Sequence, residues 1–296
     1  MAKAYTPGLL VTRHKKHRCI RRLPIEGDVK VAVGDRVVAD DIVAETALPG
    51  DVNPINLSNM MSLPPKDVID CMLKKEGDLI ALDEPLAQSK GMFGMFRTIV
   101  HSRYEGTVET VSPVTGQVII RGAPLPVQVR AYMGGEVVAV REHEGCEIEA
   151  DVAYVQGIFG VGGETHGRIV MACDSHEQEL TPDCISEDMT DAVIIGGARM
   201  TVAAIKKAQS VGAAAIISGG IDDQDLKNLL GYDLGVAITG REDLGITVIV
   251  TEGFGDIAMA DRTFAMLKDY VGQDASVNGA TQIRAGVIRP ELIIPP

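Results

Sequence analysis

A repeated motif is the feature of this sequence that most constrains its fold. The segment VAVGDRVVADDIVAET at residues 31–46 aligns with KKEGDLIALDEPLAQS at residues 74–89, at a constant offset of 43 residues. Each copy predicts a Gly-Asp turn, a short strand, an acidic turn and a second strand. The matched positions are Gly34/Gly77, Asp35/Asp78, Asp40/Asp83, Asp41/Glu84, Val43/Leu86 and Ala44/Ala87.

A second repeat follows the first. Residues 106–111 with Gly116 match residues 135–140 with Gly145 at an offset of 29, and each copy predicts a glycine-started strand, a turn and a returning strand. The β-rich region therefore extends to about residue 150. Between the copies of the first motif, residues 57–77 contain Pro-Pro followed by helically spaced apolar residues, which predicts a helical insertion.

The cadence G-D-x-[VI]-x-x-D-[DE]-x-[VL]-A resembles the biotinyl/lipoyl domains and their relatives, the barrel-sandwich hybrids. The segment LPIEGDVKVAVGDRVVADDIVAET at residues 23–46 is similar to the N-terminal region of the RnfC component of Rnf electron-transport complexes, and the likeness covers roughly residues 20–150. The resemblance implies that the two half-motifs together close one small β-structure. The cysteine-rich iron–sulfur spacing of the rest of that component is not matched.

A lipoyl or biotin carrier needs a lysine at the tip of the hairpin that follows the first half-motif. After Ala44 the chain continues ETALPGDV, without lysine, and after Ala87 it continues QSKGMFGMF, where Lys90 comes too early for the lipoyl register. We therefore expect no cofactor of this kind. Residues 91–96 are interpreted as core packing, with a hydrophobic contact patch as the alternative.

The pattern changes from about residue 190, where buried strands alternate with amphipathic helices. This predicts a small α/β domain with a mostly parallel sheet. We accordingly expect an α+β multidomain protein with four parts. They are a basic arm at 1–25, the barrel-sandwich domain at 26–150, a glycine-rich hairpin and connector at 151–189, and the α/β domain at 190–296.

Ligands of open α/β sheets bind at the carboxyl ends of strands, and glycine-bearing loops mark those ends here. The candidate ligand-binding residues at that edge are Gly219, Gly220, Asp222, Gly253 and Gly255. A nucleotide or phosphorylated metabolite is the ligand class that such loops favour. Tight strand-to-helix turns and helix N-caps are the alternative explanation of the same residues.

The glycine-rich turn at residues 160–167 offers another candidate site. Successive bare N–H groups at Gly162 and Gly163, with His166 beside them, can hold a phosphate or carboxylate. The alternative is a mobile hairpin tip.

Two pairs of soft ligands are candidates for zinc. His143-x-x-Cys146 and Cys173-x-x-His176 each place two ligands three residues apart across a predicted turn. Because neither pair is C-x-x-C and both turns would have to meet in space, incidental placement is the favoured interpretation.

The first 25 residues contain seven Lys/Arg and no acid, within a chain whose net charge is -13. Such an arm can contact nucleic acid or an acidic partner. The favoured alternative is a strand that contacts the acidic body of its own chain, since that body would repel a polyanion.

The sequence also supports expectations about the protein's compartment and function. The chain has no apolar run long enough to span a bilayer and no signal-peptide block, and its five cysteines fit reduced thiols, so a cytoplasmic location is expected. The sequence favours a non-catalytic accessory or scaffold protein over an enzyme, with a protein partner. The rivals are an enzyme or sensor for a phosphorylated ligand and a nucleic-acid-associated module. Partner identity and oligomeric state stay open.

Overall fold

The computed structural model describes residues 9–89, 97–230, 244–281 and 288–296 of a strand-rich, mixed α+β chain. The chain forms two compact units. The first contains residues 1–22, 29–44 and 129–296, and the second contains residues 23–28 and 45–128. These limits differ from the expected divisions after residues 25, 150 and 189, because the second unit interrupts the first.

The front part of the first unit is a β-structure. Its strands are β1 (Val11–Arg22), β3 (Arg36–Val37), β12 (Gly135–Arg141) and β13 (Gly145–Gln156), hydrogen-bonded in the order β1-β13-β12-β3. A three-stranded sheet of order β11-β4-β2, whose strands each have residues in both units, joins β4 (Ile42–Leu48) to β11 (Leu125–Arg130) and β2 (Asp28–Val29). Expected as a separate arm, β1 is instead an integral strand that pairs antiparallel with β13 over Val11–Arg22.

The rear part of the first unit continues the same sheet, because β13 pairs with β21 (Glu291–Ile294). Parallel pairs join β15 (Glu164–Met171), β16 (Ala192–Ile195), β18 (Ala215–Ile221) and β19 (Thr247–Phe254). The strands β14 (Phe159–Val161) and β20 (Asp274–Asn278) add antiparallel pairs, and the short β17 (Arg199–Met200) pairs with β18.

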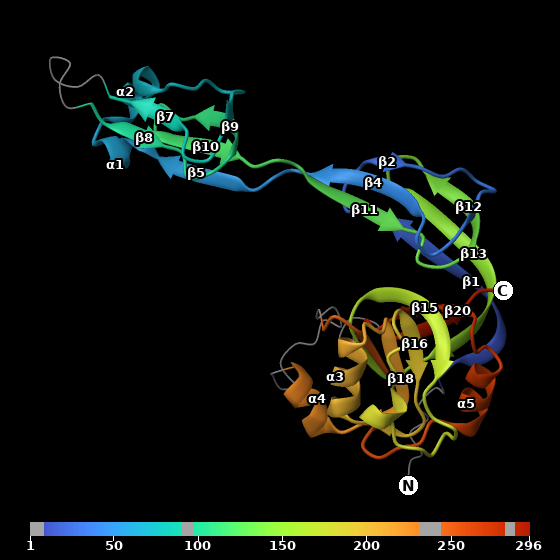
Figure 1. Cartoon of the computed structure of the whole chain (residues 1–296). Helices are drawn as coiled ribbons and strands as arrows, with labels where there is room; N and C mark the ends of the chain where they lie inside the picture. Colours follow the sequence, from blue (N-terminus) through green and yellow to red (C-terminus); the bar gives the residue numbers. More distant parts are fainter. Residues whose placement is uncertain (1–8, 90–96, 231–243, 282–287) are drawn as a thin grey trace, which may run out of the picture. The chain divides into compact units, whose positions relative to one another are not determined.

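Helices flank the rear strands. Figure 1 shows α3 (Val202–Ser210) and α4 (Asp223–Leu230) on one side of these strands and α5 (Asp261–Lys268) on the other. A short 3-10 turn, η2, spans Pro182–Cys184. The α3 helix begins where the Thr201 hydroxyl accepts the Ala204 N–H, and its buried residues Ala204, Ile205 and Ala208 face the core. The buried-on-both-faces strand β18 fits its central place in this layered arrangement.

The second unit holds six short strands and the inserted helices. Its four-stranded sheet has the order β5-β10-β9-β6, formed by β5 (Val52–Asn56), β6 (Leu79–Ile80), β9 (Gly106–Val111) and β10 (Gln117–Arg121). A separate pair joins β7 (Pro85–Gln88) and β8 (Ile99–His101). Helices α1 (Leu57–Met61), α2 (Pro65–Val68) and η1 (Ile69–Cys71) lie inside the predicted insertion at 57–77.

The two units contain the same strand plan. We call β1, β3, β4, β11, β12 and β13 the outer module, and β5 to β10 the inner module. The sheet order β1-β13-β12-β3 of the outer module corresponds to β5-β10-β9-β6 of the inner one. Registers agree as well, since Gly135 lies opposite Val37 in one and Gly106 lies opposite Ile80 in the other.

Hydrogen bonds of the repeated Gly-Asp turn are the same in both modules. Gly34 N–H donates to Val137 O over 2.8 Å, and Gly77 N–H donates to Val108 O over 2.7 Å. Both glycines have a positive φ, +95° and +91°, which explains why glycine recurs there. The following aspartates repeat a turn as well, and their bonds are Ala32 N to Asp35 Oδ2 and Lys75 N to Asp78 Oδ2, each 2.7 Å.

The resemblance implied that the two half-motifs together close one small β-structure. In this fold they do not pair with each other. The strand after the Gly-Asp turn of each half-motif pairs with its own copy of the second repeat, β3 with β12 and β6 with β9. The inner module is inserted between β4 and β11. That connection corresponds to the link between β7 and β8 of the inner module.

Candidate functional site

The strand β1 presents a different set of side chains on each of its faces. Successive residues of a strand point to opposite faces, so Lys15, His17, Cys19 and Arg21 share one face, and these four are partly buried. A register shift between Thr12 and Lys15 sets where this alternation begins. Polar side chains from other strands gather around the four residues and form one charged and aromatic cluster with them.

At one end of this cluster, a guanidinium is held in place by three groups. Arg21 donates to both carboxylate oxygens of Glu164 over 2.8 Å each, and its Nε donates to Arg130 O over 2.7 Å. Its Cζ lies 5.6 Å from the centroid of the Tyr132 ring. The Arg21 side chain is only 14% exposed, so its guanidinium is a largely buried charge. Its stability in the fold depends on the bidentate pairing with Glu164.

At the other end, two tyrosines share one carboxylate. The Tyr154 hydroxyl donates to Glu291 Oε2 over 2.7 Å, and the Tyr132 hydroxyl donates to Glu291 Oε1 over 3.4 Å. The Lys15 Nζ lies 3.5 Å from the centroid of the Tyr154 ring, and the His17 ring centroid lies 5.5 Å from the same ring. Lys15 thus makes a cation–π contact at the edge of the cluster.

Burial sets the protonation of this cluster. It lowers the pKa of Lys15 and of His17, against the opposing charge of Glu291. Burial also raises the pKa of the Cys19 thiol to about 11, although Arg21 opposes the shift. At neutral pH Cys19 is therefore a thiol and a poor nucleophile. The cluster resembles a satisfied polar core more than a nucleophilic centre.

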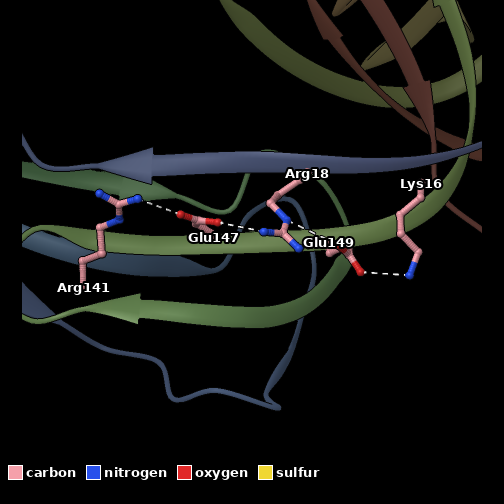
Figure 2. A network of polar contacts seen from close by, with 5 residues as sticks. All are labelled: Lys16, Arg18, Arg141, Glu147 and Glu149. Carbon is pink, nitrogen blue, oxygen red and sulfur yellow. Dashed lines mark hydrogen bonds and ion pairs between the residues drawn. The ribbon is translucent and has the colours of Figure 1, made fainter.

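The opposite face of β1 forms an ion-pair ladder with β12 and β13 (Figure 2). Lys16 Nζ lies 3.1 Å from Glu149 Oε1, and Arg18 NH2 lies 2.8 Å from Glu149 Oε2. Glu147 joins Arg18, at 3.4 Å, to Arg141, at 3.0 Å. Two bases of the predicted arm, Lys16 and Arg18, are thus paired with acids of their own chain, as the alternative to nucleic-acid contact expected.

The predicted glycine turn lies between β14 and β15, beside a hollow of about 850 Å³ that includes Gly162, Gly163 and His166 in its lining. The Gly163 carbonyl accepts the Thr247 hydroxyl over 3.0 Å. His166 points to Asp40, with 3.1 Å between Nε2 and Oδ2. The carboxylates that also line the hollow, Asp40, Glu164 and Asp191, oppose the anion that the sequence suggested.

The predicted glycine edge of the rear sheet is filled by the chain itself. A Cβ added at Gly219 would lie 2.3 Å from Met259 N, and one at Gly220 would lie 2.4 Å from Gly255 O. These two glycines lie within β18 and let the segment after β19 pack directly on the end of that strand, a packing contact rather than the tight strand-to-helix turn given as the alternative.

The other candidates at this edge also have local roles. The Asp222 carboxylate accepts the Gln224 N–H over 2.8 Å at the start of α4. Gly253 and Gly255 adopt φ of +155° and +109°, and Gly255 N–H donates to Ile221 O over 2.8 Å. The side-chain and backbone contacts of this edge are therefore those of a cap and a turn.

The two candidate zinc pairs lie in different cores. Cys146 is buried in the core of the outer module, whereas Cys173 is buried in the core of the rear strands. His143 lies in the β12–β13 turn with φ of +64°, and His176 Nδ1 lies 2.9 Å from Met259 O. Over the four stretches that the structure describes, no three His, Cys, Asp or Glu side chains group as a metal site.

Sequence analysis missed the inward cluster of β1. Its signal was present, because Lys15, His17, Cys19 and Arg21 recur at the two-residue period of a strand. Interpreting the segment as an arm concealed that period. No sequence signal pointed to Tyr154, Glu164 and Glu291, which come from distant strands, or to Tyr132, which lies between β11 and β12.

Comparison with protein-family models, with curated proteins and with solved structures found no match to this chain. None of the helices within the described ranges combines the length and apolarity needed to cross a membrane. The polar cluster around β1 is therefore identified from the geometry of this structure alone.

Proposed function

We propose that this chain is a non-catalytic accessory or scaffold protein, in which two nested modules of the biotinyl/lipoyl barrel-sandwich type present the inner module to a protein partner. One observation supports this most directly. The inner module is inserted between β4 and β11, the connection that corresponds to the link between β7 and β8. In a carrier domain that hairpin tip holds the cofactor and meets the partner.

The matching connection in the inner module begins and ends with paired backbone. Ser89 N–H donates to Thr98 O over 2.9 Å, and Thr98 N–H donates to the Ser89 hydroxyl over 2.8 Å. Lys90 and the segment 91–96 lie outside the described residues. The proposal therefore rests on the outer module, in which the half-motif at residues 31–46 is followed by the inserted residues 45–128 instead of a lysine-bearing hairpin.

The inner module has exposed apolar side chains suited to a protein partner. Two of its exposed large hydrophobic residues, Leu79 at 74% and Leu82 at 60%, lie close together in the sequence. Single exposed apolar side chains are ordinary, but a concentration of them marks interaction surfaces. A docking role gives this surface a purpose that a closed structural domain would not need.

The two rival functions receive less support from the same geometry. Gly219 and Gly220 accommodate backbone atoms of residues 255–259, which accounts for them without a phosphorylated ligand. Two of the exposed bases of β1, Lys16 and Arg18, are paired with Glu147 and Glu149, which accounts for these two without nucleic acid.

The proposal is tested by comparing the full chain with a variant in which residues 47–126 are replaced by a short Gly/Asn turn. Both are used as affinity baits after cross-linking in the source cells, and any protein retained only by the full chain is purified and titrated calorimetrically. We expect a saturable complex that requires the inner module. Retention of the same proteins by both baits contradicts the proposal.

Two further measurements test a carrier role and the metabolite-binding rival. Intact mass spectrometry that found a lipoyl or biotinyl adduct would make the chain a carrier. A thermal-shift screen with nucleotides and inorganic phosphate should give no stabilisation, whereas a shift removed by Gly255→Val would support the metabolite-binding rival.

A further inference from the structure

We propose that Leu79, Leu82 and Asp83 of the inner module form the docking surface, and that the partner is a protein presenting an apolar patch beside a basic side chain. We call these three residues the docking face. This inference rests on the proposed function and specifies the surface and the partner's chemistry. The two modules are equivalent, so the contacts made by the corresponding residues of the outer module indicate what the docking face can bind.

In the outer module the equivalent residues are Arg36, Ala39 and Asp40. They line a groove of about 1260 Å³ within the first unit, opposite residues 272–276 at the start of β20. Asp40 spans the groove, since its Oδ2 lies 3.1 Å from Nε2 of His166 on β15. This position of the module therefore faces a neighbouring protein layer. Its aspartate binds a basic side chain of that layer through Oδ2 and Arg130 of its own module through Oδ1.

In the inner module the same position is open. Leu79 is 74% exposed and Leu82 is 60% exposed, although the neighbouring Ile80 is buried in the module's own core. The Asp83 backbone is fixed, because its N–H donates to Ser102 O over 2.9 Å and its carbonyl lies 2.6 Å from His101 Nδ1. Within the described residues, no side chain pairs with the Asp83 carboxylate.

The substitutions between the modules indicate the partner's chemistry. Arg36 is replaced by Leu79 and Ala39 by Leu82, so both positions become larger and apolar, whereas the exposed Val38 is replaced by Ala81 and the aspartate at 40 and 83 is kept. Water-exposed leucines that flank a carboxylate match an apolar surface with a cationic group at its rim. A second copy of this chain fits less well, since its corresponding basic group, His166, already binds Asp40.

The experiment uses the full chain with a photo-cross-linking amino acid in place of Leu79, and a matched control with the same amino acid in place of Val114. Val114 is 82% exposed and lies in the β9–β10 turn, outside the docking face. We expect a protein cross-linked at position 79 and not at 114. That protein is then purified, and its binding to the full chain is measured calorimetrically.

The decisive variant gives the inner module the outer module's residues, Leu79→Arg with Leu82→Ala. Since the outer module accommodates Arg36 and Ala39 at the equivalent positions and both leucines are exposed, the variant should keep the wild-type thermal transition. We expect it to weaken binding at least tenfold, the scale of a lost interface anchor. Asp83→Asn should weaken binding less and flatten its dependence on salt, and Val114→Arg should leave binding unchanged.

Three outcomes overturn the inference, and they differ in what they leave standing. If position 79 cross-links a second copy of this chain, the docking face mediates self-association. If a partner binds but the double variant binds it normally, docking occurs elsewhere and the proposed scaffold function stands. If neither cross-linker position nor the bait experiment yields a partner, the proposed function fails together with the inference.

Discussion

In the outer module, Arg21 lies opposite Cys146 across the β1–β13 pair, whereas in the inner module Ile55 lies opposite Val118 across the equivalent β5–β10 pair. One position of a common scaffold thus holds a guanidinium in one copy and a buried aliphatic side chain in the other. The guanidinium is tolerated because Glu164 reaches it from the rear strands. A buried charge in this scaffold requires a neighbour that supplies its partner.

The surfaces differ in the complementary direction. Where the outer module faces its neighbouring layer, it shows Arg36 and a paired Asp40, and where the inner module is open, it shows Leu79 and Leu82. The fold of both modules depends on equivalent positions that are apolar and fully buried in each, such as Val43 in one and Leu86 in the other. The surface residues that differ between the modules correspond to the different surroundings of each module.

The largest expected effect comes from the shared core. Ile148 and Ile120 occupy the same place and are both fully buried, so replacing either by alanine should lower the free energy of unfolding by about 3 kcal/mol. Native-state hydrogen exchange should show loss of protection in the inner module alone for Ile120→Ala and in the first unit alone for Ile148→Ala. Equal loss in both units from one variant would mean that they unfold together. Ile20→Ala, at a half-exposed position, is the control.

The next effect separates the copies. Arg21→Ile gives the outer module the inner module's residue and leaves Glu164 and Arg130 O without their donor, so it should destabilise by about 2 kcal/mol. Glu164→Gln in the same chain should recover part of the loss, and a double-mutant cycle by urea denaturation should give a coupling of about 1 kcal/mol. Additive effects of the two substitutions would contradict the assigned pair.

A smaller effect tests the equivalence itself. Asp35→Ala and Asp78→Ala each remove a 2.7 Å acceptor for a turn N–H, Ala32 in one module and Lys75 in the other. Each should cost about 1 kcal/mol, because one backbone donor loses its side-chain partner. Chemical denaturation of both variants checks the values, and a difference between them above about 1 kcal/mol would show that the turns are not equivalent.

The repeats identified the pieces of the front half but not their pairing. The offsets of 43 and 29 residues located both copies of each motif, and the strands, turns and short helices lie where the pattern predicted them. The nesting was missed because Gly34 can in principle pair with Val108 or with Val137, whose local sequences are alike. Only the long-range register decides this, and a local pattern contains no information about it.

The candidate sites show the same limit. His166 was identified from its glycine-rich turn, but Asp40, its partner at 3.1 Å, lies in a different sequence region. Gly219 and Gly220 suggested a ligand because close approach to a ligand and close approach to residues 255–259 require the same residue type. A glycine pattern therefore predicts that something comes near the backbone, and the fold determines what.

The smallest expected effect concerns the aspartate that both modules retain. The hydrogen bond from His166, aided by Arg130, lowers the pKa of Asp40 below its ordinary value of 3.8. Because the folded-state pKa is depressed, this contribution to stability is present above about pH 4 and is lost as the pH falls through the folded-state value. Asp40→Asn should cost about 0.5 kcal/mol at neutral pH, since all three side chains are well exposed.

Urea denaturation at several pH values makes this a comparison between the modules. The difference between wild type and Asp40→Asn should narrow as the pH is lowered from about 5 to about 2, because protonation of Asp40 removes the same interaction that the substitution removes. Asp83→Asn is the matched control, since no described side chain pairs with that carboxylate, and it should not change stability at neutral pH. An equal loss from both substitutions would show that the aspartate stabilises its own turn, and the proposed contrast between a covered and an open face would lose its basis.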